Sequence, residues 1–300
     1  MGAESSKGNK AFVNILPVSR HELGPMWTNN KMPGPCYKWA VNDKWNVSDF
    51  RMYNVTYPDD CRGEPFVICY HIHSNRSLDT VAKEIGRIPA PMRQAASVFM
   101  TYSDMLGENP SYDRTNYLVA AVYQDGAIFG RSNGYFPAAL VHEVTHLIDG
   151  TLASPDAVHP APGNTQFSST QKWRDPVNND GYAISEYGAS AGYQEDFADV
   201  GRAVLLDTIY PGGLKNLSDN NANLTLITKQ LKAFKDQAGT YYRKGGSCND
   251  SLRFRYPTLM DIPKQPEQPA PGLPQYSQCG GKDWTGPTKC ATGLVCVYVK

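Results

Sequence analysis

Residues 142–146 read His142-Glu143-Val144-Thr145-His146, and this short run decides how the rest of the chain is interpreted. In a helix, positions i and i+4 lie on one face, so the two imidazoles can reach the same Zn²⁺ ion. Glu143 then lies beside the ion, where its carboxylate can take a proton from a bound water. The run predicts a zinc-dependent hydrolase with His142 and His146 as ligands and Glu143 as general base.

A hydrolytic zinc site needs a third protein ligand, and the best candidate is Glu195. Glu195 begins the run EDFAD, which ends at Asp199 one helical turn later. Glu195 can bind zinc, while Asp199 can accept the free N–H of a ligand histidine and fix its tautomer. The alternative is an acidic helix start without a ligand role, since Asp and Glu favour the first turn.

HExxH followed by ExxxD resembles the gluzincins, the thermolysin-like zinc peptidases, and residues 186–199 are similar to the catalytic domain of anthrax lethal factor and its relatives. The resemblance covers residues 136–206. It implies an α+β, zincin-like fold with a mixed sheet and an active-site helix, and an endopeptidase activity. It also implies that the Tyr187 hydroxyl stabilises the oxyanion, although a tyrosine that only packs a loop is the alternative.

Residues 181–188 also resemble the aspzincins, whose zinc ligand is an aspartate in a GTxDxxYG segment. Here Tyr182 replaces the threonine and Ile184 replaces the aspartate. Because isoleucine cannot bind zinc, we favour Glu195 as the third ligand. The substitutes that this second resemblance leaves open are Asp175, Asp180 and Glu186.

Apolar periodicity predicts helices and strands without regular βαβ alternation, which favours the α+β class. Strands are expected over residues 65–73 and 116–123, and helices over 78–85, 92–105, 137–150, 193–206 and 223–238. Residues 151–181 are rich in Pro, Asn, Asp and Ser and are predicted to form a long loop.

Composition divides the 300 residues into four segments. Residues 1–10 are polar and expected to be disordered, and residues 11–262 form the peptidase domain. Residues 263–274 are proline-rich and predict a linker, and residues 275–300 form a small cysteine-rich module.

Charge and hydropathy exclude two classes of partner. Lys+Arg and Asp+Glu both number 29, and no basic stripe interrupts this balance, which argues against nucleic acid. No apolar run approaches the length of about 18 residues that a membrane span requires. We expect a monomer that acts on protein or peptide substrates.

The segment CGGKDWTGPTKCATGLVC, which follows Tyr276 closely, resembles the fungal-type, family 1 cellulose-binding module. The resemblance implies a disulfide-stapled sheet that joins Cys279 to Cys296, leaves Cys290 without a partner and presents aromatic rings to cellulose. Tyr276 and Trp284 are the candidate carbohydrate-binding residues. The family pattern continues beyond Cys296 to a fourth cysteine, so we expect a truncated module with weakened binding to cellulose or plant cell wall.

Sequons and cysteines predict an extracellular glycoprotein. The sequons are at Asn46, Asn54, Asn75, Asn216, Asn223 and Asn249. No cysteine belongs to a CxxC pair, which favours disulfides over a structural zinc site. The pairing among Cys36, Cys61, Cys69 and Cys248 stays open, with Cys61–Cys69 the easiest in local terms.

These features together predict a secreted, fungal-type zinc endopeptidase that is held on cellulose-containing material. A non-catalytic, carbohydrate-associated protein built on a zincin fold is the main alternative. An intact Glu143 favours the enzyme, because a binding protein has no need of a general base.

Overall fold

The computed structural model describes residues 16–42, 44–60, 64–101, 120–122, 126–130, 137–153, 166–213, 225–242 and 258–263, together with Gly280 and Val297. The chain divides into two compact units, Met1–Asp261 and Ile262–Lys300. Every helix and strand named below belongs to the first unit. Within the described ranges, no helix has the length and apolar character needed to cross a bilayer.

A six-stranded mixed sheet runs through the first unit in the order β1-β3-β4-β5-β7-β6. Its strands are β1 (Glu22–Met26), β3 (Phe50–Thr56), β4 (Phe66–His71), β5 (Val98–Thr101), β6 (Ala120–Val122) and β7 (Ala127–Gly130). The central strands β4, β5 and β7 are parallel, whereas β1, β3 and β6 pair antiparallel with their neighbours. A separate pair joins β2 (Lys31–Pro33) to β8 (Leu259–Asp261).

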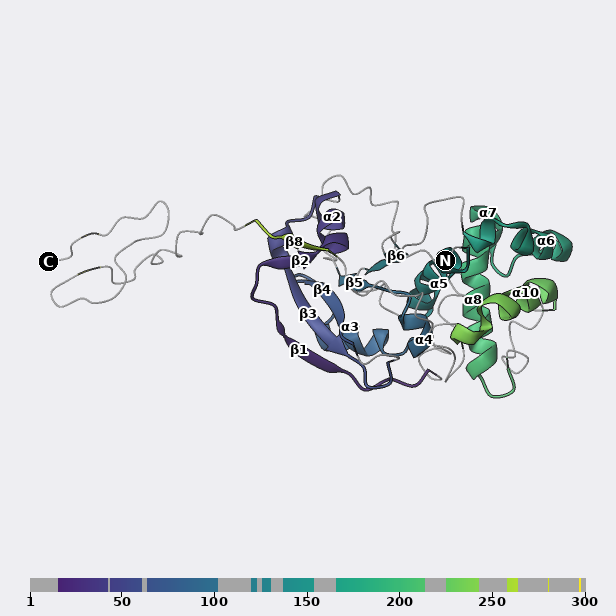
Figure 1. The fold of residues 1–300 in the computed structure, drawn as a ribbon, viewed down its shortest axis with the longest axis horizontal. Helices are drawn as coiled ribbons and strands as arrows, with labels where there is room; N and C mark the ends of the chain where they lie inside the picture. The colour runs from purple at the N-terminus through teal and green to yellow at the C-terminus, as the bar shows by residue number, and fades with distance from the viewer. Residues whose placement is uncertain are drawn as a thin grey trace. The chain divides into compact units, whose positions relative to one another are not determined.

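Most of the helices gather beside the β6 side of the sheet (Figure 1). The helices are α2 (Gly34–Asn42), α3 (Leu78–Ile85), α4 (Ala90–Arg93), α5 (Pro137–Ala153), α6 (Gln171–Asp180), α7 (Glu186–Ala191), α8 (Tyr193–Ile209) and α10 (Thr228–Ala238). Short 3₁₀ turns are η1 (Val47–Asp49), η3 (Phe167–Ser169) and η5 (Gly239–Tyr242). One apolar core joins the helices to the sheet, so the architecture is α+β, as the sequence predicts.

Helices α5 and α8 lie against each other, and Gly201 sets how closely they approach. A Cβ atom on Gly201 would stand 2.7 Å from both Cγ2 and Oγ1 of Thr145, and 3.0 Å from the Tyr242 hydroxyl. The Thr145 hydroxyl is itself in hydrogen-bond contact with the Tyr242 hydroxyl, at 2.6 Å. Because only glycine fits this space, the HExxH helix can pack directly on the ExxxD helix.

A disulfide joins Cys36 in α2 to Cys69 in β4. This bond decides part of the pairing that the sequence left open, and it excludes the locally easier pair of Cys61 with Cys69. Both half-cystines are fully buried. The bond therefore ties α2 to a central strand from within the core.

The helix predicted over 92–105 is wrong. The chain instead forms the short helix α4 and then the strand β5, whose four residues are all buried. β5 pairs with a parallel strand along each edge, and because its side chains alternate between the two faces and all four are buried, both of its faces are covered. A strand buried on both faces reads as a continuous apolar run, which periodicity cannot distinguish from a buried helix.

The long loop predicted over 151–181 is also wrong, because this stretch contains η3 and α6. Helix α6 is polar almost throughout, but Trp173 is fully buried in the core against Phe197 and Phe234. One large aromatic side chain thus anchors a helix whose composition resembles that of a loop. Helix α5 also continues to Ala153, beyond the end predicted at Gly150.

Candidate metal centre

The two histidines of the HExxH run lie one turn apart on α5 and share a face. Their Nε2 atoms are 3.1 Å apart, and their rings meet edge to face. The apolar face of the same helix is buried and fixes its rotation. It consists of Leu140, Val141, Val144, Leu147 and Ile148.

Helix α8 brings Glu195 to these histidines. Glu195 Oε2 lies 2.9 Å from Nε2 of His142 and 3.4 Å from Nε2 of His146. Among the residues that the structure describes, these three form the one group of His, Cys, Asp or Glu side chains arranged to hold a metal ion. Tertiary packing therefore joins the two sequence motifs at one point.

The alternative ligands do not join this group. Asp180 is instead engaged at the start of α10, where its carboxylate accepts the backbone N–H groups of Lys229 and Gln230. Asp175 lies within α6, and Glu186 is exposed in the first turn of α7.

The three donor atoms fit a zinc ion. Tetrahedral ligands at about 2.0–2.1 Å from zinc are separated from one another by about 3.3 Å. The observed separations of 2.9, 3.1 and 3.4 Å are near this value. Two imidazoles and one carboxylate are also the donor set of a hydrolytic site that keeps one position for water.

Asp199 orients His142 from behind. Its Oδ1 lies 2.8 Å from His142 Nδ1, so the imidazole can donate Nδ1–H to Asp199 while Nε2 faces Glu195 and His146. Asp199 also accepts hydrogen bonds from Ser185 and Arg202. Burial opposes ionisation of Asp199, but His142 and Arg202 outweigh it and hold the pKa of this carboxyl below its usual range.

The same contacts shift the ionisation of His142 and Glu195. Burial disfavours the charged imidazole, but hydrogen bonds with Asp199 and Glu195 outweigh burial and raise the pKa of His142 to about 9. For Glu195, burial is likewise outweighed by hydrogen bonds with His142 and His146, which hold its pKa well below the usual range. His142 therefore retains a proton that a bound cation would displace.

Glu143 is buried beside the histidines. Burial raises the pKa of its carboxyl, although the neighbouring His146 and His142 act in the opposite direction. A carboxylate with a raised pKa is a stronger base, which suits a group that has to accept a proton.

Tyr187 also lies beside the cluster. Its ring is 6.3 Å from the ring of His142, between centroids, and 43% of the residue is exposed. Burial and the adjacent Glu195 raise the pKa of Tyr187 to about 12, so the phenol keeps its proton near neutral pH. The structure thus brings together all the site residues that the sequence predicts in this domain.

Ser185 and Arg202 both contact Asp199, and neither contact is predicted by the sequence. Arg202 is three residues after Asp199 on α8, a spacing at which helical side chains meet. Ser185 is the N-cap of α7, and a serine directly before the acidic residue Glu186 is a recognisable start signal. Neither pattern alone indicates a link to a metal site.

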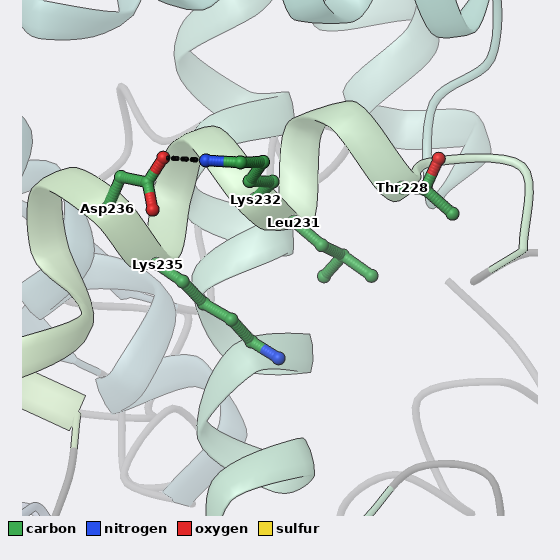
Figure 2. Close-up of a pocket in the computed structure, with 5 residues that line it drawn as sticks. All are labelled: Thr228, Leu231, Lys232, Lys235 and Asp236. Atoms are coloured by element: carbon green, nitrogen blue, oxygen red, sulfur yellow. Dashed lines mark hydrogen bonds and ion pairs between the residues drawn. The ribbon is translucent and has the colours of Figure 1, made fainter.

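A pocket of about 370 Å³ lies on α10. Figure 2 labels the five residues that line it, Thr228, Leu231, Lys232, Lys235 and Asp236. Lys232 pairs with Asp236 at 2.5 Å, and Lys235 pairs with Asp207. Because both ammonium groups are neutralised and no lining residue belongs to the donor group of His142, His146 and Glu195, we assign no function to this pocket.

The candidate carbohydrate-binding residues Tyr276 and Trp284 lie outside the described residues. The remaining cysteines also lie there, namely Cys61, Cys248, Cys279, Cys290 and Cys296.

Comparison with known proteins gives two family matches. Residues 3–260 match the family described as conidiation-specific protein Con-13, and residues 275–300 match the fungal cellulose binding domain. The second match confirms the resemblance of the cysteine-rich segment to a cellulose-binding module.

Conidiation-specific protein 13 of Neurospora crassa is 25% identical over 245 residues, which are 81% of this chain and 64% of that protein. The chain therefore spans a little less than two thirds of that relative. No solved structure matches the chain.

Proposed function

The chain belongs to the family of conidiation-specific protein Con-13, and for this member we propose the activity of a secreted, zinc-dependent endopeptidase. One observation carries the proposal, namely the close approach of His142, His146 and Glu195 through three donor atoms. The likeness to gluzincins in the HExxH and ExxxD runs supports the same activity. The name of the Neurospora crassa relative suggests that this chain, too, has a role in conidiation.

His142, His146 and Glu195 would hold the ion. Bound there, zinc would polarise the substrate carbonyl and lower the pKa of a water molecule to about 7. Asp199 keeps Nδ1 of His142 protonated and Nε2 turned toward the site through their 2.8 Å contact. Arg202 in turn keeps Asp199 ionised.

Glu143 acts as the base. One of its carboxylate oxygens accepts the proton of the attacking water and then passes it to the nitrogen of the leaving amine. The buried position of Glu143 limits competition from bulk water for this proton. The Tyr187 hydroxyl donates a hydrogen bond to the carbonyl oxygen as negative charge develops on it.

The first test compares hydrolysis of casein by the full chain and by Glu143→Gln, each loaded with zinc. The substitution keeps the shape of the side chain but removes the base, so kcat/KM should fall by about 10²-fold or more while the zinc content stays equal. A zinc chelator should abolish cleavage by the wild type. Glu186→Gln is the matched control, because this exposed glutamate lies outside the donor group, and it should keep full activity.

Two results would contradict the proposal. A folded, zinc-loaded wild type that cleaves no protein would favour the non-catalytic alternative. Glu195→Ala that still binds zinc as tightly as the wild type would remove Glu195 as a ligand and reopen the aspzincin-type arrangement.

The match to the fungal cellulose binding domain favours the alternative of a carbohydrate-associated protein. The two functions are compatible, since a module of this type can hold a peptidase on cellulose-containing material. An experiment can distinguish the two functions, because cellulose adsorption does not require Glu143, whereas the proposed proteolysis does.

A further inference from the structure

A chain of hydrogen bonds continues beyond Asp199 and ends on the helix that carries Tyr187. Asp199 Oδ1 contacts His142, and its Oδ2 accepts the hydroxyl proton of Ser185. The Ser185 oxygen then accepts the backbone N–H of Gly188 at 2.8 Å, which caps the first turn of α7. The Ser185 hydroxyl therefore contacts both Asp199, which orients His142, and the first turn of α7, which carries Tyr187.

We propose that Ser185 is a positioning residue that couples the orientation of His142 to the placement of the helix bearing Tyr187. The inference rests on the proposed peptidase function, because the coupling matters only if both side chains act on the same substrate.

The chemistry of the hydroxyl supports this role over capping alone. Asp and Asn cap helices as well as Ser does, so capping does not require a hydroxyl. The contact with the Asp199 carboxylate does require a donor, and an aspartate at position 185 would have none. Ser185 donates to Asp199 with its proton and accepts from Gly188 with a lone pair, and the two contacts exist together.

Close packing of α7 on α8 leaves little room for Ser185 to move. A Cβ atom on Gly188 would stand 3.0 Å from the Cα of Asp196 and 3.2 Å from Ser185 Oγ. The first turn of α7 is thus pressed against the residue that follows Glu195. A displaced Ser185 would loosen α7 at this point, next to the donor group.

The test compares Ser185→Ala with Ser185→Thr, which keeps the hydroxyl. Ser77→Ala is the matched control, since Ser77 caps α3 in the same way by accepting the Thr80 N–H. We expect Ser185→Ala to weaken zinc affinity about tenfold, the lower end of the roughly 10- to 100-fold effect of outer ligand partners. It should also lower kcat with KM unchanged. Ser185→Thr should restore both, and Ser77→Ala should lower only the melting temperature.

A double substitution distinguishes the effect of Ser185 on His142 from its effect on Tyr187. In a Tyr187→Phe background, Ser185→Ala should cost less in kcat than it costs in the wild type, because the hydroxyl it positions is already absent. The loss of zinc affinity should be the same in both backgrounds. Additive losses in kcat would overturn the coupling to Tyr187.

A measurement without metal or substrate distinguishes failure of this inference from failure of the proposed function. The NMR signal of the His142 Nδ1 proton should shift in Ser185→Ala and stay in place in Ser77→Ala. An unchanged signal in Ser185→Ala would show a simple helix cap and overturn the inference, whether or not the chain is a peptidase. A shifted signal in a chain that cleaves nothing would sustain the coupling to His142 and reject the peptidase.

Discussion

At the scale of single residues, His142 would link the proposed metal site to pH. Its pKa is about 9 in the folded chain against 6.5 for an isolated histidine, because Asp199 and Glu195 outweigh the effect of burial. A raised folded-state pKa stabilises the metal-free protein fully below pH 6.5, and this stabilisation is lost as the pH rises toward 9. Zinc needs the neutral imidazole, so metal and proton compete for Nε2 of His142.

We therefore expect zinc affinity to rise about tenfold per pH unit between pH 7 and 8.5 and to level off above about 9. Calorimetry in buffers of different ionisation enthalpy should detect the release of about one proton per zinc bound at pH 7.5. Asp199→Asn, which removes the charge behind His142, should reduce this proton release. A zinc affinity that is independent of pH in the wild type would refute the competition.

At the scale of elements, the contact between α5 and α8 assembles the site. Gly201→Ala would place a methyl group within 2.7 Å of the Thr145 side chain and force the helices apart. Overpacking of this kind costs about 1–3 kcal/mol, and the better helix propensity of alanine returns less than about 1 kcal/mol. We expect a melting temperature lower by several degrees and a weaker zinc site, measured by thermal unfolding and metal competition.

Gly239→Ala is the control for this change. A Cβ atom at Gly239 would meet Lys235 Cβ at 3.7 Å, an ordinary contact distance, so the stability of this variant should equal or slightly exceed that of the wild type and its zinc affinity should be unchanged. If Gly201→Ala behaved like Gly239→Ala, close packing at this point would not control the metal site.

The elements also show what a sequence can predict. The helix over 78–85 is confirmed with its Ser77 cap, because both the cap and the apolar face are local signals. The strand β5 was predicted as a helix, since its burial depends on neighbours that are distant in sequence. Helix α6 was missed because a single buried tryptophan, rather than a periodic apolar face, holds it in place.

The candidate site likewise combines local features that the sequence predicts with contacts that only the fold creates. The spacing of His142 and His146 and that of Glu195 and Asp199 are helical periods, which are visible in the sequence. Their meeting depends on tertiary packing. The contacts of Ser185 and Arg202 with Asp199 could not be predicted, because polar residues near helix ends are common and only the fold shows which carboxylate they reach.

At the scale of the whole molecule, the chain combines a Con-13 domain with a segment that matches a cellulose-binding domain. The second was identified from sequence because its cysteines and glycines form a dense local pattern. The Con-13 family was not identified from the sequence, because its match is spread over residues 3–260 and not concentrated in a short motif. This combination predicts that adsorption to cellulose and the proposed metal chemistry are separable in one chain.

Tyr276→Ala should weaken adsorption to cellulose and leave zinc binding and proteolysis unchanged. By resemblance, Tyr276 belongs to the aromatic row that contacts cellulose, and truncation of such an anchor costs about 1.4 kcal/mol or more, a tenfold or greater loss of affinity. Adsorption isotherms on microcrystalline cellulose should show this loss, while zinc affinity and casein hydrolysis stay at wild-type values. Tyr187→Phe should give the opposite result, with lower kcat and unchanged adsorption. Equal adsorption by the wild type and Tyr276→Ala would mean that Tyr276 is not the anchor, and a wild type that does not adsorb would exclude cellulose as a partner of this chain.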